Sequence, residues 1–267
     1  MKKLLLSFLL IVGLSACGGS EEKSPVVGEV NALYNKGLNL LLADEYSQAV
    51  HTFEELERQH PYSRWATRAQ MMVVYAHYRA REYDEAVAGA QRFIQTHPGH
   101  KLLPYVHYLR AMSFYEQIAD VRRDQGATRK AMSAFREIDK RFPETTYAQD
   151  ARLKMTLTRD HLAGKEMEVG RFYQDKQQYP AALNRFQTVV QKYQQSSHTP
   201  EALFRMTEVY IALGIPQQAQ RAAAILGHNY PDSAWYEYAY EKLQNSEIKP
   251  IDPEKAEEGG FLGILGF

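Results

Sequence analysis

The sequence has a single cysteine, Cys17, among its 267 residues, and no excess of charge of either sign. One thiol cannot close a disulfide within the chain, so the stability of the fold must come from packing. The 32 basic and 32 acidic residues balance each other. This balance argues against a nucleic-acid-binding surface and against a polybasic membrane patch.

Motifs for catalysis, cofactor binding and metal binding are also missing. The sequence has no Gly-x-Ser-x-Gly turn, no glycine-rich phosphate loop and no dinucleotide fingerprint. Three of its nine histidines, His97, His100 and His107, lie close together in sequence. A Pro98-Gly99 turn interrupts them, and neither a cysteine nor a His-Glu-x-x-His helix accompanies them. We therefore expect no enzyme activity, no cofactor and no metal site.

The first residues have the features of a bacterial export signal. Lys2 and Lys3 give a positive start, and residues 4–14 form an apolar stretch that is too short to span a bilayer. The stretch ends in Leu14-Ser15-Ala16-Cys17, a small-residue cleavage site with cysteine directly after the cut. This pattern resembles the lipobox of bacterial lipoproteins. We expect residues 1–16 to be a signal peptide and Cys17 to be lipidated; the alternative is an ordinary secreted protein with one unrelated cysteine.

The residues after Cys17 predict the destination of the lipid anchor. Gly18-Gly19-Ser20 has no aspartate at the second mature position. By resemblance to lipoprotein sorting in Gram-negative bacteria, this favours the outer membrane, on its periplasmic side. Several acyl chains together bind a membrane far more firmly than one. We expect residues 17–29 to be a flexible tether between this anchor and the rest of the chain.

A repeat with a period of 37 residues organises the rest of the chain. Tyr46-Ser-Gln-Ala49 recurs as Tyr83-Asp-Glu-Ala86 and Tyr179-Pro-Ala-Ala182, with two weaker copies. The pattern resembles the tetratricopeptide repeat (TPR), in which a small residue and an alanine let two helices pack closely and a proline ends the second helix. The predicted fold is all-α: a TPR solenoid of five helix pairs plus a C-terminal capping helix at Ser233 to Gln244. The small or slender residues that mark the first helix of each pair are Gly37, Val74, Ala111, Gly170 and Thr207.

The repeats predict a division of the chain. We expect residues 30–145 to hold repeats one to three and residues 146–245 to hold repeats four and five with the capping helix. Residues 246–267 are expected to be a disordered tail. Its apolar end, Phe261 to Phe267, is either a frayed terminus or a contact with the membrane or a partner.

Local signals predict where helices begin. Thr146-x-x-Gln149 reads as a capping box, Thr199-Pro200 as an N-cap followed by proline, and Pro104 as the opening of another first helix.

One step between repeats is irregular. The small-residue marks are 37, 37, 59 and 37 residues apart. Eight of the 22 extra residues lie in the turn of repeat three, at 120–130, and fourteen lengthen the first helix of repeat four, at about 146–175. The two interpretations are drift in a loop with an overlong helix, or two specialised contact features.

Counting along the first helix of each repeat gives the expected lining of the inner groove. Repeats one to three give an aromatic and apolar lining, whereas repeats four and five give Met167, Arg171, Gln174, Phe204, Glu208 and Ile211, which is more polar. Tyrosine offers a large contact area at small entropy cost, and an arginine can bind a C-terminal carboxylate. The alternative is that the tyrosines only pack between helices. The expected peptide groove consists of Tyr34, Leu38, Arg68, Met71, Tyr75, Tyr78, Arg79, Tyr108, Met112 and Tyr115, with Leu41 beside them.

The array from about Asn31 to Leu243 resembles the BamD family, also called YfiO or ComL. The resemblance is carried by Tyr75-Ala-His-Tyr78, by Arg92-Phe-Ile94 leading to His97-Pro98, and by Asn184-Arg185. The runs from Gln117 to Gln125 and from Gly164 to Arg171 look like the alphaproteobacterial members. The turn of repeat three is shorter than in enterobacterial members, which puts functions peculiar to that loop in doubt.

The resemblance implies an outer-membrane lipoprotein that acts with the barrel-forming assembly factor to fold and insert outer-membrane proteins. The first repeats would recognise the C-terminal signal of unfolded substrates. The last repeats would dock on the periplasmic domains of the barrel factor, in a complex with other lipoproteins. Arg185 matches a basic docking position of the family, and we expect Arg171 to belong to the same surface. The alternative is another periplasmic TPR scaffold lipoprotein, such as a pilus-assembly pilotin or a peptidoglycan-enzyme adaptor.

Overall fold

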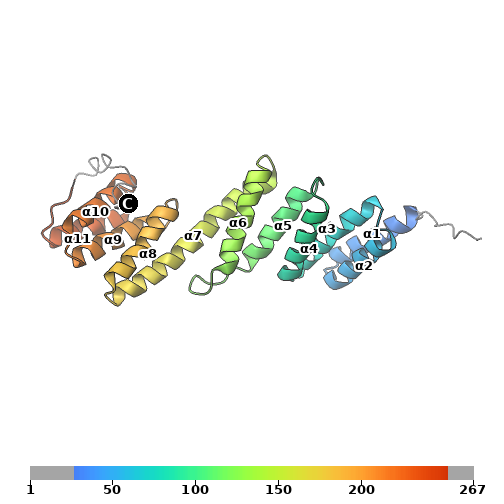
Figure 1. The fold of residues 1–267 in the computed structure, drawn as a ribbon, viewed down its shortest axis with the longest axis horizontal. Helices are drawn as coiled ribbons and strands as arrows, with labels where there is room; N and C mark the ends of the chain where they lie inside the picture. Colours follow the sequence, from blue (N-terminus) through green and yellow to red (C-terminus); the bar gives the residue numbers. More distant parts are fainter. Residues whose placement is uncertain (1–26, 252–267) are drawn as a thin grey trace, which may run out of the picture.

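A computed structural model describes residues 27–251, and within this range the regular structure is entirely helical. Figure 1 shows a row of helix hairpins, with α1 and α2 at one end, α9 to α11 at the other, and the long α7 crossing the middle. The all-α TPR solenoid of five pairs and a capping helix is confirmed. The helices are α1 (Val27–Leu42), α2 (Tyr46–Gln59), α3 (Arg64–Arg79), α4 (Tyr83–Thr96), α5 (Leu103–Glu116), α6 (Gly126–Arg141), α7 (Thr146–Asp175), α8 (Tyr179–Lys192), α9 (Thr199–Ala212), α10 (Pro216–Asn229) and α11 (Ala234–Asn245).

The array has a succession of small cores instead of one. Buried apolar side chains form one cluster over α1–α3, a second over α3–α5, a third over α5–α7 and a fourth over α7–α11. Ala148 and Ala151 in the first half of α7 belong to the third cluster, and Ala163 and Met167 in its second half belong to the fourth. Helix α7 is therefore the element that joins the two halves of the solenoid. No helix within residues 27–251 is long and apolar enough to cross a membrane.

The small residues of the repeat do allow close packing. A Cβ built on Gly37 would lie 2.6 Å from the ring of Phe53, and one on Gly170 would lie 2.4 Å from the ring of Phe186. Both phenylalanines are fully buried and stand on the second helix of the same pair. The glycine therefore makes room for the aromatic ring of its partner helix.

This contact predicts a loss of stability for Gly170→Val. Overpacking a tight core site typically costs ~1–3 kcal/mol, which outweighs the few tenths of a kcal/mol that valine gains over glycine in helix propensity. The urea midpoint of the full chain should fall accordingly. Gly99→Val is the matched control, because a Cβ at Gly99 would meet nothing within 4 Å. Equal midpoints for the two variants would contradict the packing role of Gly170.

The turn between the two helices of a repeat has a recurring backbone conformation. Asp44, Arg81, Gln177 and Gly214 all have positive φ, at 58°, 63°, 57° and 72°. They stand at the same place in repeats one, two, four and five, but only the last is glycine, which adopts this conformation without steric cost. Repeat three has no such residue in its turn, because its insertion replaces the tight turn.

The two insertions of the irregular step pack against each other. Lys165 Nζ on α7 donates to the carbonyl of Arg122 in the repeat-three turn at 3.0 Å, and Arg122 lies 3.5 Å from Glu168. The loop after α8 covers the same stretch of α7, since Ser197 N donates to Asp160 at 3.0 Å. The extra length of α7 and the long turn are thus matched features, which loop drift alone does not explain.

Two predicted helix starts are wrong by one residue. The N-cap of α7 is Thr145, whose hydroxyl accepts from the backbone N–H of Ala148 at 3.2 Å, and Thr146 is the first helical residue. The N-cap of α9 is His198, because the hydroxyl of Thr199 donates backwards to carbonyls of the preceding loop. The openings of α5 with Pro104 and of α11 after Ser233 are confirmed.

Candidate substrate groove and docking surface

Tyrosines from α3, α5 and α7 gather on the first helices of repeats two to four. The ring of Tyr147 lies 5.4 Å from the rings of Tyr105 and Tyr108, and Tyr75 and Tyr78 are near enough to influence the ionisation of Tyr105. Tyr108 OH donates to Asp150 Oδ2 at 2.7 Å. Burial raises the pKa of both Tyr105 and Tyr108, so their hydroxyls stay protonated and remain donors.

These tyrosines are half-buried, so they serve the core and still present a surface. Tyr75, Tyr78, Tyr108 and Tyr115 pack against the second and third clusters of the array without being enclosed. Aromatic rings in this position combine a large contact area with a polar tip. The structure therefore brings the predicted residues Tyr75, Tyr78 and Tyr108 near one another, together with Tyr105 and Tyr147.

Arg79 is held by the neighbouring repeat. Its guanidinium donates to the hydroxyls of Tyr75 and Tyr46 at 2.9 Å each and to Asp44 Oδ1 at 3.3 Å. Tyr46 OH also donates to Asp44. The side chain of Arg79 thus ties α3 to the turn after α1, and its charge already has a carboxylate partner.

Arg68 lies at a different aromatic group. Its guanidinium stands 5.0 Å from the ring centre of Trp65, whose ring is 4.5 Å from that of Tyr34. No carboxylate within residues 27–251 forms an ion pair with Arg68, which is exposed. Burial raises the pKa of Tyr34, and the positive charge of Arg68 opposes that shift. Of the two predicted cations, Arg68 is the one that has no carboxylate partner in the described part of the chain.

Four other predicted groove residues have less room for a ligand. Met71 and Met112 are only 9% and 8% exposed and belong to the core clusters, so they form the floor beneath the tyrosines. Leu38 is half-buried and packs against the first cluster. Tyr115 stands edge-on to Phe135 at 5.9 Å, with Lys154 Nζ 4.9 Å from its ring centre.

Counting positions along the first helices missed four aromatic residues that contact the predicted groove residues: Tyr46, Trp65, Tyr105 and Tyr147. Tyr105 stands one helical turn before Tyr108 and shares its face, a spacing that the sequence displays. Trp65 and Tyr147 stand near the starts of α3 and α7, outside the three positions counted on each helix.

The three neighbouring histidines do not form one site. His97 Nε2 bonds to Gln70 at 2.7 Å, whereas His107 is fully buried beside Phe142 and Glu137. Burial lowers the pKa of His107 to about 4, so this side chain is neutral near pH 7. Among residues 27–251 no cluster of three potential ligands could hold a metal ion.

The polar lining of the last repeats is a network of ion pairs. Arg171 on α7 binds Glu168 at 2.7 Å and Glu201 on α9 at 3.0 Å. Arg205 binds Glu201 at 3.3 Å and Glu208 at 3.0 Å. These bonds fasten α7 to α9, so the charge of Arg171 is already satisfied within the chain.

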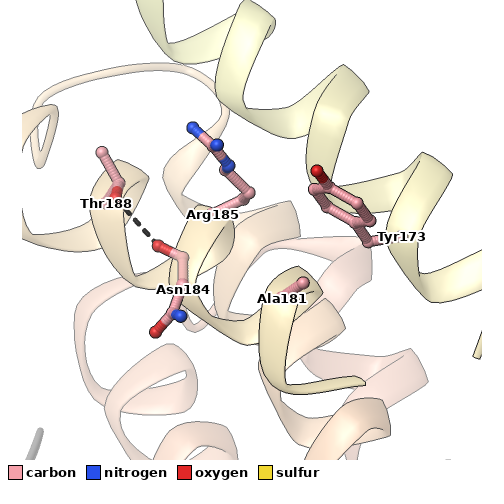
Figure 2. A pocket seen from close by; sticks show the side chains of 5 residues that line it. All are labelled: Tyr173, Ala181, Asn184, Arg185 and Thr188. Carbon is pink, nitrogen blue, oxygen red and sulfur yellow. Dashed lines mark hydrogen bonds between the residues drawn. The ribbon is translucent and has the colours of Figure 1, made fainter. Parts of the chain in front are cut away.

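Arg185 stands on a different surface, on α8. Its guanidinium lies 3.0 Å from Glu166 Oε2 and is 44% exposed. Figure 2 shows Arg185 and Asn184 together on α8, with Tyr173 of α7 facing them across a cavity of about 260 Å³. Glu166 and Arg171 are five residues apart on α7, about 140° around the helix. The structure therefore does not bring Arg185 and Arg171 into one site, in contrast to the sequence-based expectation.

The described array matches a family model over most of its length. Residues 28–226 match the model named YfiO, described as an outer membrane lipoprotein. The chain belongs to the YfiO family. Proteins named outer membrane protein assembly factor BamD are similar to it: one from Caulobacter vibrioides is 44% identical, covering 93% of this chain and 83% of the relative. One from Rickettsia prowazekii is 40% identical, covering 90% and 97%.

The resemblance stated from the sequence is thus confirmed for the YfiO family, including its alphaproteobacterial character. Among solved structures, a thermophilic TPR protein of Thermus thermophilus matches 82% of this chain and all of its own, with 15% identity and a TM-score of 0.39.

Proposed function

We propose that this YfiO-family chain is a lipid-anchored outer membrane protein assembly factor on the periplasmic side of the outer membrane. The family match carries the proposal: relatives that bear the name BamD are 40–44% identical over at least 90% of the chain. The lipobox at Cys17 supports the anchor, although Cys17 lies outside the described residues. In this proposal the chain works by binding proteins, with the barrel-forming factor and other lipoproteins of the complex as partners.

The first three repeats are proposed to bind the C-terminal segment of unfolded outer-membrane proteins. Such segments carry alternating aromatic residues and a free carboxylate. The half-buried tyrosines of α3 and α5 suit the aromatic residues, and Arg68 suits the carboxylate because its charge has no ion-pair partner within residues 27–251. Arg79 is a weaker candidate, since Asp44 already pairs with it.

The fourth repeat is proposed to dock on the periplasmic domains of the barrel-forming factor through Arg185. An exposed guanidinium held by a single carboxylate can exchange that partner for one on another protein. Arg171 pairs with Glu168 on α7 and with Glu201 on α9. These ion pairs make it a structural residue that links the two helices, so we do not include it in the docking contact.

Arg185→Glu should abolish co-purification with the barrel-forming factor from solubilised outer membrane. Breaking one side of a buried interfacial charge pair typically costs ~2–5 kcal/mol, or on the order of a 30-fold loss of affinity or more. Circular dichroism should stay helical, because Arg185 makes only one ion pair within residues 27–251. Arg92→Glu is the matched control, an exposed arginine of α4 with the same change of charge.

The same pull-down tests the assembly role against that of another scaffold. Wild-type chain that recovers a pilin or a peptidoglycan hydrolase, and no barrel factor, would contradict the proposed function. Recovery of the barrel factor by both wild type and Arg185→Glu would keep the function and reject Arg185 as its docking residue.

A further inference from the structure

Two neighbouring loops at the N-terminal end of the solenoid carry an aromatic and basic surface. One loop joins α2 to α3, and the other joins α4 to α5. Tyr62 in the first loop is fully exposed, and Arg64, Arg68 and Lys101 are exposed as well. The guanidinium groups of Arg64 and Arg68 stand 5.6 and 5.0 Å from the ring centre of Trp65. We call these five residues the basic edge.

No carboxylate balances the charge of the basic edge in the described part of the chain. Arg64, Arg68 and Lys101 form no ion pair within residues 27–251. Burial lowers the pKa of His100, and the positive charges of His97, Lys101 and Arg68 lower it further. Arg68 and Lys101 therefore act on the same imidazole, which shows that the two loops form one surface.

The equivalent loops of the later repeats have no such charge. The loop from α6 to α7 carries Glu144, and the loop from α10 to α11 carries Asp232. Neither these two loops nor the one from α8 to α9 contains a lysine or an arginine. The balanced charge of the whole chain therefore conceals a local positive surface, confined to the first repeats.

Both loops are held by hydrogen bonds of their own. The hydroxyl of Ser63 accepts from the backbone N–H of Ala66 at 3.1 Å, and Nδ1 of His100 accepts from the backbone N–H of Leu102 at 3.2 Å. A surface that is ordered in advance loses little conformational entropy when it binds.

The basic edge lies where the chain enters the array. Tyr34, two turns into α1, has its ring 4.5 Å from that of Trp65 at the start of α3. Figure 1 shows α1 at the outer end of the row of helices. Val27, the first residue of α1, is ten positions after Cys17. Such a length of chain reaches at most about 35 Å, so an anchor at Cys17 would keep this end of the solenoid close to the membrane.

We propose that the basic edge contacts the phospholipid headgroups of the membrane that holds the anchor. The inference rests on the proposed lipidation of Cys17 and adds a second contact, which orients the solenoid on the membrane. Tyrosine and tryptophan favour the membrane–water interface, and each lysine or arginine near an anionic surface strengthens binding about fivefold. Such a contact is weak by itself. The anchor makes it effective, because a short tether holds the edge at a high local concentration beside the headgroups.

The test uses the lipidated full chain in vesicles of phosphatidylethanolamine and phosphatidylglycerol, with no other protein present. Gly99→Cys provides a site for a fluorophore, because a Cβ there would meet nothing within 4 Å and Cys17, the single cysteine of the sequence, carries the lipid. Asp232→Cys is the matched control, an exposed residue in the equivalent loop of the last repeat. A nitroxide on the lipid headgroup should quench the label at 99 several-fold more strongly than the label at 232.

Variants of the basic edge test which side chains make the contact. Tyr62→Ser combined with Arg64→Glu should weaken the contact roughly 25-fold, because the charge changes by two units. Quenching at 99 should then fall to the level seen at 232, and leaving out phosphatidylglycerol should also reduce it. Tyr240→Ser combined with Arg92→Glu is the control, since both residues are exposed and lie outside the edge. Arg68 stays unchanged, because it is assigned to the peptide carboxylate.

The outcomes separate this inference from the proposed anchor. Mass analysis of each preparation shows whether it is lipidated, and an unlipidated chain would overturn the anchor together with the contact that depends on it. A lipidated chain with equally weak quenching at 99 and 232 would overturn the contact alone. Equally strong quenching at both sites would place the whole row of loops on the membrane and reject a specific edge. Quenching at 99 that survives the Tyr62 and Arg64 changes would also reject it.

Discussion

Replacing Cys17 with serine is expected to release the protein from the membrane without unfolding it. The lipobox ends at this residue, and acyl chains on its sulfur and amine would form the membrane anchor. The array of residues 27–251 has its own cores, so circular dichroism of the variant should match that of the wild type. In membrane fractionation, the wild type should be found in the outer membrane and the variant in the soluble fraction.

Mass analysis of the mature N-terminus checks the chemistry behind this result. The wild-type chain should begin at Cys17 with three acyl groups, and an intact signal or an unmodified Cys17 would contradict the prediction. Gly18→Asp is a useful companion variant. It should stay lipidated but remain at the inner membrane, because aspartate at the second mature position is the retention signal in the Gram-negative sorting system that this N-terminus resembles. Sorting of both proteins to the same membrane would reject that part of the proposal.

The sequence predicted the architecture because the TPR pattern depends on contacts inside one repeat. Gly37 packs against Phe53 and Gly170 against Phe186. The two residues of each pair are sixteen positions apart, so the same residue types recur in the sequence with the same spacing. The exact helix starts were not predictable in the same way, since adjacent threonines at 145 and 146 can each cap a helix and only the backbone conformation decides between them.

The contacts that sequence reasoning missed join distant repeats. The ion pair between Arg171 and Glu201 links α7 to α9 across thirty residues, and no local sequence pattern predicts it. The repeat-three turn meets α7 through Lys165 and Arg122, which are 43 residues apart. Both insertions were visible in the sequence, but their mutual packing depends on the path of the chain between them. For that reason the contact between the two insertions could be described only from the structure.

Changing Tyr75, Tyr78 and Tyr108 together to alanine is expected to weaken binding of an outer-membrane-protein C-terminal peptide on the order of 100-fold. The wild-type affinity should be about micromolar, because the peptide loses conformational entropy when it is ordered. Each tyrosine is expected to contribute ~1 kcal/mol, so one change is hard to measure and three are not. Fluorescence anisotropy with a labelled peptide gives the affinity, and circular dichroism shows whether the variant is folded.

The structure makes a matched control necessary, since these rings also pack against the core. Tyr75→Phe, Tyr78→Phe and Tyr108→Phe together keep the rings but remove the bonds to Arg79 and Asp150. If ring contact area carries the binding, the phenylalanine variant should stay within a few-fold of the wild type. A folded alanine variant that binds as tightly as the wild type would show that the tyrosines are only core residues and that the substrate site lies elsewhere.

Recognition of the terminal carboxylate of the peptide can be measured separately from the tyrosine contacts. Amidating the peptide removes its terminal charge and should weaken binding to the wild type several-fold. If Arg68 is the partner, Arg68→Gln should weaken binding of the free-acid peptide similarly, and amidation should then have no further effect, because the two changes remove one interaction. Arg79 cannot substitute for it without releasing Asp44 and the two tyrosine hydroxyls that it holds. Additive effects of Arg68→Gln and amidation would mean that another cation receives the carboxylate.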